Sequence, residues 1–189
     1  MKNTAAQCHS NTKLIINLST QLLFLLFFAA QTSLFAAENL NTALQTHKWD
    51  RLIGTWVDAS TQGTFLKTTY VWKFKDTVIE NTVIDGQGKR THGIIGRNPK
   101  TGAIFTMSAN SSGGSSIGTI TLGEKQAVYD VGFVTEQGHE GKLKLMLEFE
   151  DDDTLNIIID APEPVTIKMH RLVAPDLLGG DKPLENPNF

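Results

Sequence analysis

From residue 54 onward, apolar and polar side chains alternate with a period of two, which is the spacing of a β-strand with one buried face. Segments rich in Val, Ile, Thr and aromatic residues are separated by Gly, Asn, Asp and Pro, the residues that favour turns. The predicted strands cover residues 54–59, 64–74, 77–84, 89–96, 103–109, 116–122, 126–135, 142–150, 154–159 and 165–172. Before them, residues 39–49 predict a short helix, because Leu40, Leu44 and Trp49 fall on one face.

The connections between these strands are short, which favours antiparallel neighbours in up-and-down order. An open sheet of this size would leave two unpaired edges, so a closed barrel is expected and a sandwich is the second choice. The predicted fold class is therefore all-β, an antiparallel up-and-down barrel of about ten strands preceded by a short N-terminal helix. Residues 173–189 are expected to form a loose C-terminal tail, because they show little periodicity and contain three prolines.

The first 37 residues predict a secretory signal peptide. Lys2 and Lys13 supply positive charge, an apolar stretch covers residues 22–30, and Ala36 and Ala37 offer a cleavage site. An uncleaved membrane anchor is the alternative, but polar residues keep the apolar stretch well below the ~20 residues that a span needs. We therefore expect a secreted or periplasmic protein, with a mature barrel domain over residues 38–172 and no stable membrane insertion after cleavage.

The composition limits the chemistry that the mature chain can perform. The only cysteine, Cys8, lies within the predicted signal, so the mature chain has no disulfide, no thiolate nucleophile and no cysteine-based zinc site. Lys and Arg number 17 against 20 Asp and Glu, for a net charge of −3. No excess of positive charge is available to hold a phosphate backbone, so a nucleic-acid partner is not expected.

The apolar parity of each strand predicts which side chains face the interior. Residues 142–150 show it most clearly, because leucine alternates there with lysine and glutamate. Glu80 is expected inside because it shares its parity with Val78, and His92 because it shares its parity with Ile94. A ten-stranded barrel has room for a ligand once its side chains are placed. The predicted cavity lining is Tyr70, Trp72, Glu80, His92, Phe105, Met107 and Tyr129.

The segment Gly54-Thr55-Trp56 resembles the entry to lipocalin and fatty-acid-binding barrels. The resemblance implies that Trp56 plugs one end of the barrel and that a basic residue of the last strand packs over it. Arg171 is that residue here, because it shares its parity with the apolar residues of the last predicted strand. Such a contact is a cation–π interaction. Gly54, Trp56 and Arg171 are therefore the expected residues of barrel closure.

A closer resemblance is to a family of uncharacterised bacterial secreted domains with a lipocalin-like barrel. It is carried by the Gly-Thr-Trp start, by the segment 93–97 (Gly-Ile-Ile-Gly-Arg) and by the turn 98–102 (Asn-Pro-Lys-Thr-Gly) that follows. A Ser- and Gly-rich segment after the fifth predicted strand and the basic last strand add to it. The likeness covers about residues 48–172 and implies a fold more than an activity.

Cofactor and metal sites are not expected. The start also resembles that of nitrobindin-type barrels, which bind haem through a histidine near the C-terminus, and His170 lies in the last predicted strand. However, the parity that places Arg171 inside places His170 outside. The remaining histidines lack metal-ligand spacing, and residues 151–153 (three aspartates) lack the spaced ligands of a calcium loop. No serine-nucleophile signature is present, so no catalytic residues are assigned.

Three functions fit these features. The first is a binding protein that holds a small, mostly apolar molecule inside the barrel, and the sequence favours it over an enzyme. The second is an isomerase or hydrolase that uses Glu80 or His92 in the same cavity. The third is a non-catalytic envelope protein that binds another protein through its outer surface.

Overall fold

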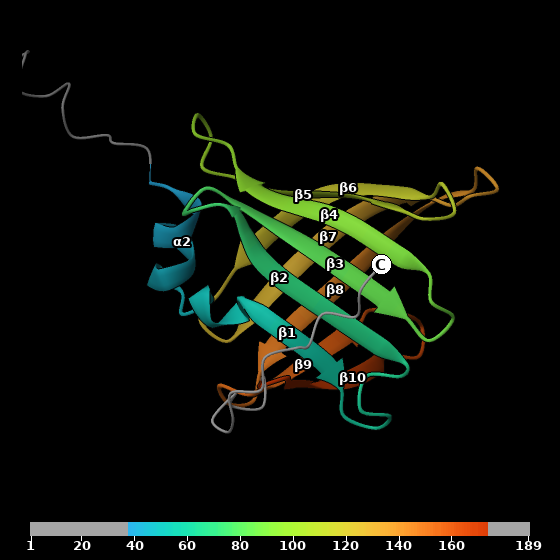
Figure 1. Ribbon diagram of the computed structural model, residues 1–189. Coiled ribbons are helices and arrows are strands. Elements are labelled where there is room, and N and C mark those ends of the chain that lie inside the picture. The colour runs from blue at the N-terminus through green and yellow to red at the C-terminus, as the bar shows by residue number, and fades with distance from the viewer. Residues whose placement is uncertain (1–37, 174–189) are drawn as a thin grey trace, which may run out of the picture. The chain divides into compact units, whose positions relative to one another are not determined.

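The computed structural model describes residues 38–173, and their strands form one closed antiparallel barrel (Figure 1). The predicted fold class is confirmed, and the barrel takes the place of the alternative sandwich. The predicted signal peptide and the predicted tail beyond residue 173 lie outside the described residues. The strands are β1 (Gly54–Asp58), β2 (Leu66–Phe74), β3 (Val78–Asp85), β4 (Arg90–Arg97), β5 (Ile104–Asn110), β6 (Ser115–Leu122), β7 (Gln126–Val134), β8 (Glu140–Phe149), β9 (Thr154–Ile159) and β10 (Val165–Arg171).

Each strand pairs with the next one along the chain, and β1 pairs with β10 to close the barrel. At this seam Trp56 lies opposite Arg171, and Asp58 lies opposite Met169. Because the side chains of a strand alternate between its two faces, the register fixes which residues point into the barrel. The inward set includes Trp56, Ile79 and Met169, all fully buried.

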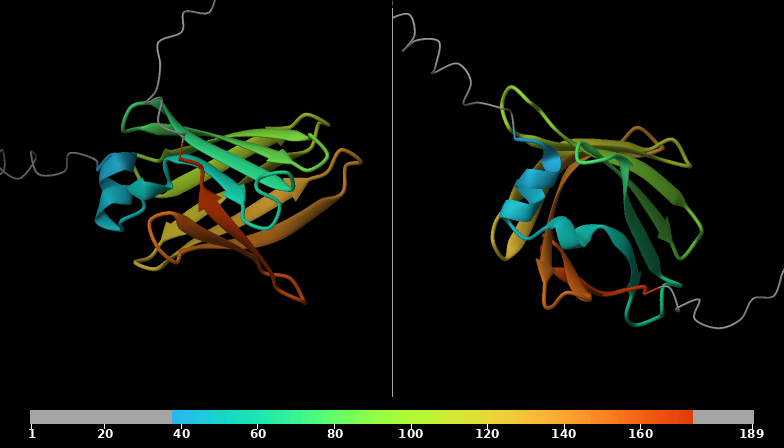
Figure 2. Two further views of the ribbon diagram at one scale, coloured as in Figure 1. Left: turned by 60° about the horizontal axis from the view of Figure 1, so that its bottom comes forward. Right: turned by 60° about the vertical axis from the view of Figure 1, so that its left-hand side comes forward.

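One end of the barrel is covered by the segment that precedes β1. Helix α2 (Leu40–Thr46) lies across this end and is followed by the 3₁₀ turn η1 (Asp50–Leu52), as Figure 2 shows. Asn39 caps α2, because its side-chain oxygen accepts a hydrogen bond from the Thr42 N–H at 2.8 Å. The helix buries Leu40 and Leu44 against the barrel. This end is therefore sealed by apolar side chains, and we call it the closed end.

Trp49 ties the closed end together. Its indole Nε1 donates a hydrogen bond to the Gly123 carbonyl, in the turn between β6 and β7, at 2.8 Å. The Phe149 ring lies between two indoles, with centroids 4.9 Å from that of Trp49 and 5.7 Å from that of Trp56. Both distances lie in the range of favourable aromatic pairs. The closed end is thus a packed aromatic core rather than an opening.

Close approach of β6 and β7 requires a glycine at position 118. A Cβ built there would lie 2.2 Å from the Asp130 carbonyl oxygen and 2.8 Å from Val131 Cα, both of them backbone atoms that cannot turn aside. Gly118→Ala is therefore expected to lower the free energy of unfolding by roughly 2–3 kcal/mol, measured by urea denaturation. Gly132→Ala on the neighbouring strand is the control, because its nearest atom would be 3.8 Å away. Equal losses in the two variants would contradict the close approach.

Candidate functional site

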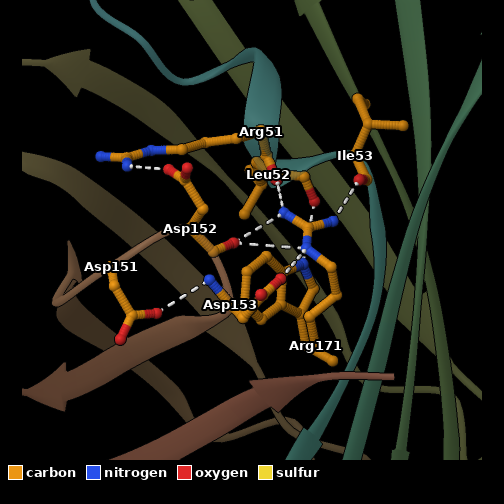
Figure 3. Close-up of polar contacts among 8 residues, drawn as sticks. Arg51, Leu52, Ile53, Asp151, Asp152, Asp153 and Arg171 are labelled. Atoms are coloured by element: carbon orange, nitrogen blue, oxygen red, sulfur yellow. Dashed lines mark hydrogen bonds and ion pairs between the residues drawn. The ribbon is translucent and has the colours of Figure 1, made fainter. Parts of the chain in front are cut away.

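Arg171, the last residue of β10, holds the closed end together through the contacts shown in Figure 3. Its guanidinium Cζ lies 4.3 Å from the centroid of the Trp56 ring, which is the contact expected from the sequence. Trp56 is itself held in place, because its Nε1 donates to the Leu52 carbonyl at 3.0 Å. A Cβ at position 54 would lie 2.6 Å from Arg171 Nη1, and the φ of Gly54 is +141°. Glycine is therefore needed at the start of β1 for both space and backbone conformation.

The Arg171 guanidinium also binds the chain that leads into the barrel. Nη1 donates to the Ile53 carbonyl at 2.9 Å, and Nη2 donates to the carbonyls of Arg51 and Asp152. The Asp153 carboxylate lies 3.2 Å from Nε and balances the charge. Because a guanidinium presents several fixed donors, one side chain joins η1, β10 and the turn between β8 and β9. These contacts give Arg171 a structural role.

Three of the predicted lining residues face the barrel interior. Tyr70 and Trp72 on β2 and Tyr129 on β7 share the inward parity of their strands, and both tyrosines are buried. The other four predicted lining residues, Glu80, His92, Phe105 and Met107, lie on the outer face. Their inward placement in the sequence analysis was wrong, and the strand register gives the reason.

On β3 both parities are apolar, so alternation does not identify the inward face. The register pairs the fully buried Ile79 with Trp72 and Ile95, and this places the parity of Ile79 inside. Glu80 then points out, as does His92 on β4, whose side chain is 61% exposed. The alternative of a barrel enzyme requires a base in the interior. Neither Glu80 nor His92 can supply that base in this geometry.

On β5 the inward side chains are Ile104 and Thr106, both buried. Phe105 and Met107 lie on the opposite face, although their side chains are more apolar than that of Thr106. The Phe105 ring covers Gly96 of β4, where a Cβ would come within 2.6 Å of the ring. Aromatic cover of a cross-strand glycine is a known way to stabilise a sheet from its outer face. An outward phenylalanine with this role cannot be told from an inward one by hydropathy.

The outward residues of β2 to β6 surround a shallow groove of about 550 Å³. Lys73 and Glu80 form an ion pair at 3.0 Å, and His92 Nδ1 lies 4.0 Å from the Glu80 carboxylate. Lys73 and His92 are exposed and Glu80 is partly exposed, and ion pairs at the surface contribute little to stability. A row of exposed apolar side chains crosses these strands in register and is interrupted at β3, where Glu80 lies between the residues of β2 and β4. It consists of Val71, Ile94, Met107 and Ile117.

Beyond the aromatic core the inward side chains are less completely buried. Several inward apolar side chains toward the end of the barrel opposite α2 are only partly buried. These side chains are Val83, Leu143, Leu145, Ile157, Ile159 and Ile167. We call these six side chains the apolar cup, and we call the end of the barrel opposite α2 the open end.

The open end is lined mostly by polar residues. A mouth of about 290 Å³ lies beside the loops that follow β3, β5 and β7. Ser108 and Ser116 face each other across β5 and β6, with their hydroxyl oxygens 2.7 Å apart. Phe133 lies at the rim, with its ring over Gly141 of β8. A polar mouth above an apolar cup is the arrangement of a pocket for a mostly apolar guest.

Four polar side chains project into the interior between the aromatic core and the apolar cup. They are Thr68, Tyr70, Asn81 and Tyr129, and we call them the polar belt. β2 and β7 are five strands apart in a ring of ten, so Tyr70 and Tyr129 come from opposite walls. Burial raises the pKa of both phenols, and the neighbouring Tyr70 raises that of Tyr129 further. Both phenols are therefore neutral at physiological pH.

A second buried site, at the open end of β1, has a structural function. The Asp58 carboxylate is 1% exposed and accepts hydrogen bonds from the backbone N–H groups of Thr61, Gly63, Phe65 and Leu66. Burial alone would raise the pKa of Asp58, but these bonds and those from the hydroxyls of Ser60 and Thr61 outweigh it. The pKa of Asp58 therefore lies well below its ordinary value, and the carboxylate organises the loop between β1 and β2.

Asp58→Asn is expected to lower the melting temperature by roughly 5–10 °C at pH 7, because the amide keeps the shape but loses the charge. A folded-state pKa below the unfolded value adds stability above about pH 4, and this stability is lost as the pH falls further. The difference between wild type and variant should therefore shrink between about pH 5 and pH 2. Thermal unfolding followed by circular dichroism across this range checks it, and a difference independent of pH would contradict the role of the charge.

Comparison with known proteins leaves the family open. No model of a known protein family matches the chain, and no curated protein matches it. Within residues 38–173, no cluster of three or more His, Cys, Asp or Glu side chains is placed to hold a metal ion. The same part of the chain contains no helix that is long and apolar enough to cross a membrane. The fold defines the chain as a closed ten-stranded antiparallel β-barrel, which is consistent with a lipocalin-like fold.

Proposed function

We propose that this protein is a secreted or periplasmic lipocalin-like carrier that holds one small, mostly apolar molecule inside its barrel. The observation that carries the proposal is the apolar cup, whose inward side chains are only partly buried in the barrel. Removing apolar surface from water contributes about 25 cal/mol per Å². A molecule seated in the cup would therefore gain affinity from the side chains that the empty barrel leaves in contact with solvent.

The two ends of the barrel support a container with one entrance. Helix α2, Trp56 and Arg171 seal the closed end, so a guest can enter only at the open end. The Gly-Thr-Trp start and the stacked arginine fit the resemblance to lipocalin-like barrels. The expected export of the chain rests on the predicted signal peptide over residues 1–37 and places the carrier outside the inner membrane.

Native mass spectrometry of the protein purified from its own host tests the proposal. We expect a bound molecule of a few hundred daltons, released when the protein is unfolded and identified in an organic extract. A fluorescent apolar probe, N-phenyl-1-naphthylamine, provides a second measurement on the extracted protein. It should bind saturably with one site, and emission of the inward Trp72 should fall as it binds. A protein that carries no molecule from its host and binds no probe would overturn the proposal.

A second candidate function is contact with another envelope protein. The exposed row of Val71, Ile94, Met107 and Ile117 favours it. The last three are neighbours in register, and adjacent apolar side chains on an outer face are typical of interaction sites. The two candidate functions depend on different surfaces of the barrel. Carriage needs the inside of the barrel, and contact with a protein needs the outer face of β2 to β6.

A further inference from the structure

The interior of the barrel is not uniformly apolar. The polar belt lies between the aromatic core and the apolar cup, and within it Tyr70 lies directly opposite Asn81 in the pairing of β2 with β3. Thr68 is two residues from Tyr70 on the same inward face. A guest that enters from the open end would meet the apolar cup first and the belt at the bottom of the cup. The belt therefore decides what kind of end group the guest can carry.

Two atoms of the belt are buried without a hydrogen-bond partner, namely Thr68 Oγ1 and Asn81 Oδ1. The Thr68 hydroxyl lies near that of Tyr70 and slightly offsets the rise in the Tyr70 pKa, but the two do not meet in hydrogen-bond geometry. A buried polar atom left unpaired costs about 1–3 kcal/mol, so native proteins nearly always pair such atoms. Both atoms have almost no solvent-accessible surface, so a partner from the interior can reach them only when a guest displaces the side chains that cover them.

The wall of the barrel holds Asn81 in this position. A Cβ at position 93 on β4 would lie 2.4 Å from Asn81 Oδ1 and 2.9 Å from the Met107 carbonyl oxygen. Gly93 therefore leaves the space that the Asn81 amide occupies. This fit shows that the amide is seated against the wall rather than turned toward water, with its oxygen buried and unpaired.

The belt carries no charge. Thr68 and Asn81 are neutral, and burial keeps the two tyrosines protonated. The inward arginines Arg97 and Arg171 are both at the closed end, where they donate to backbone carbonyls, including that of Gly102 in the case of Arg97. A carboxylate at the bottom of the cup would meet no cation and would be expensive to bury.

We propose, resting on the proposed carrier function, that the guest is a neutral amphiphile whose hydroxyl group binds Thr68 and Asn81 while its apolar body fills the cup. A hydroxyl suits the belt because it both donates and accepts. It can donate to Asn81 Oδ1 and accept from the Thr68 hydroxyl, and it serves either orientation of the amide. Long-chain alcohols and other hydroxylated lipids of similar shape belong to this class, and fatty-acid anions do not.

Displacement of N-phenyl-1-naphthylamine by three probes of equal chain length tests the assignment. The probes are 1-dodecanol, its methyl ether, and dodecanoate at pH 8. In the wild-type protein the alcohol is expected to bind at least about tenfold more tightly than either of the others, the change that ~1.4 kcal/mol produces. Asn81→Leu and Thr68→Val keep the shape of the side chains, and each should reduce the preference to about threefold or less.

Thr82→Val is the matched control. Thr82 neighbours Asn81 on β3 but points outward, where its hydroxyl lies 3.3 Å from His92 Nδ1. The variant should keep the full preference for the alcohol. If all three probes bind the wild type equally, the belt has no role in selection, although the carrier function stands. If dodecanoate binds most tightly, the neutral class is wrong. If none of the probes displaces the fluorophore and the fluorophore itself does not bind, the carrier proposal fails.

Discussion

Replacing Arg171 by methionine is expected to lower the free energy of unfolding by about 3–5 kcal/mol. Methionine keeps an unbranched apolar stem but removes the cation that lies over Trp56. The carbonyls of Ile53, Arg51 and Asp152 would each lose a charged donor, and the first two of these bonds are partly buried. Urea unfolding followed by tryptophan fluorescence measures the loss.

Lys168→Met provides the control for Arg171→Met. Lys168 lies on the same strand but faces outward, and its ion pair with Glu150, at 2.7 Å, is about half exposed. Exposed pairs of this kind are worth about 0–1 kcal/mol, so the control should stay near wild type. If the two variants lose the same stability, the network at the closed end contributes no more than a surface ion pair.

Replacing Val83 by tryptophan is expected to weaken binding of the apolar probe at least about a hundredfold, because the indole would occupy the cup. Val83 is a half-buried inward residue of β3 that lies opposite Thr68, directly above the polar belt. Fluorescence titration with N-phenyl-1-naphthylamine measures the change. Circular dichroism of the variant confirms that the sheet is retained.

Val71→Trp is the matched variant on the outer face. Val71 is a residue of the same type on the neighbouring strand, and it is 46% exposed within the apolar row. The substitution should leave probe binding unchanged. A cellular defect seen with Val71→Trp but not with Val83→Trp would instead favour the outer face as the functional surface.

Strand number, order and closure follow from the sequence because they depend on features that every strand repeats. Turn residues divide the chain at regular intervals, and short connections leave antiparallel neighbours as the simplest arrangement. The contact between Trp56 and Arg171 also follows, since the inward parity of β10 is unambiguous: Ile167 and Met169 alternate there with Lys168 and His170.

The interior surface is less predictable, because inward and outward parity must be chosen strand by strand. β3 offers Ile79 and Val83 on one face and Val78 and Ile84 on the other, so the position of Glu80 depends on a register that hydropathy does not give. Thr68 and Asn81 of the polar belt were missed for a related reason. Thr68 and Asn81 are ordinary strand residues in the sequence, and only their position opposite Tyr70 and Val83 shows that they share one wall.

The seam between β1 and β10 has a kinetic consequence. Every other strand pair joins neighbours in the chain, whereas Arg171 bonds to Ile53 across 118 residues. Hairpins between consecutive strands can therefore form early. Pairing of β1 with β10 comes last because it carries the largest loop-closure entropy. Until that moment the nascent sheet exposes two unpaired edges, which are templates for intermolecular pairing. A variant with weakened contacts at residue 171 should therefore aggregate during refolding more readily than its equilibrium stability suggests.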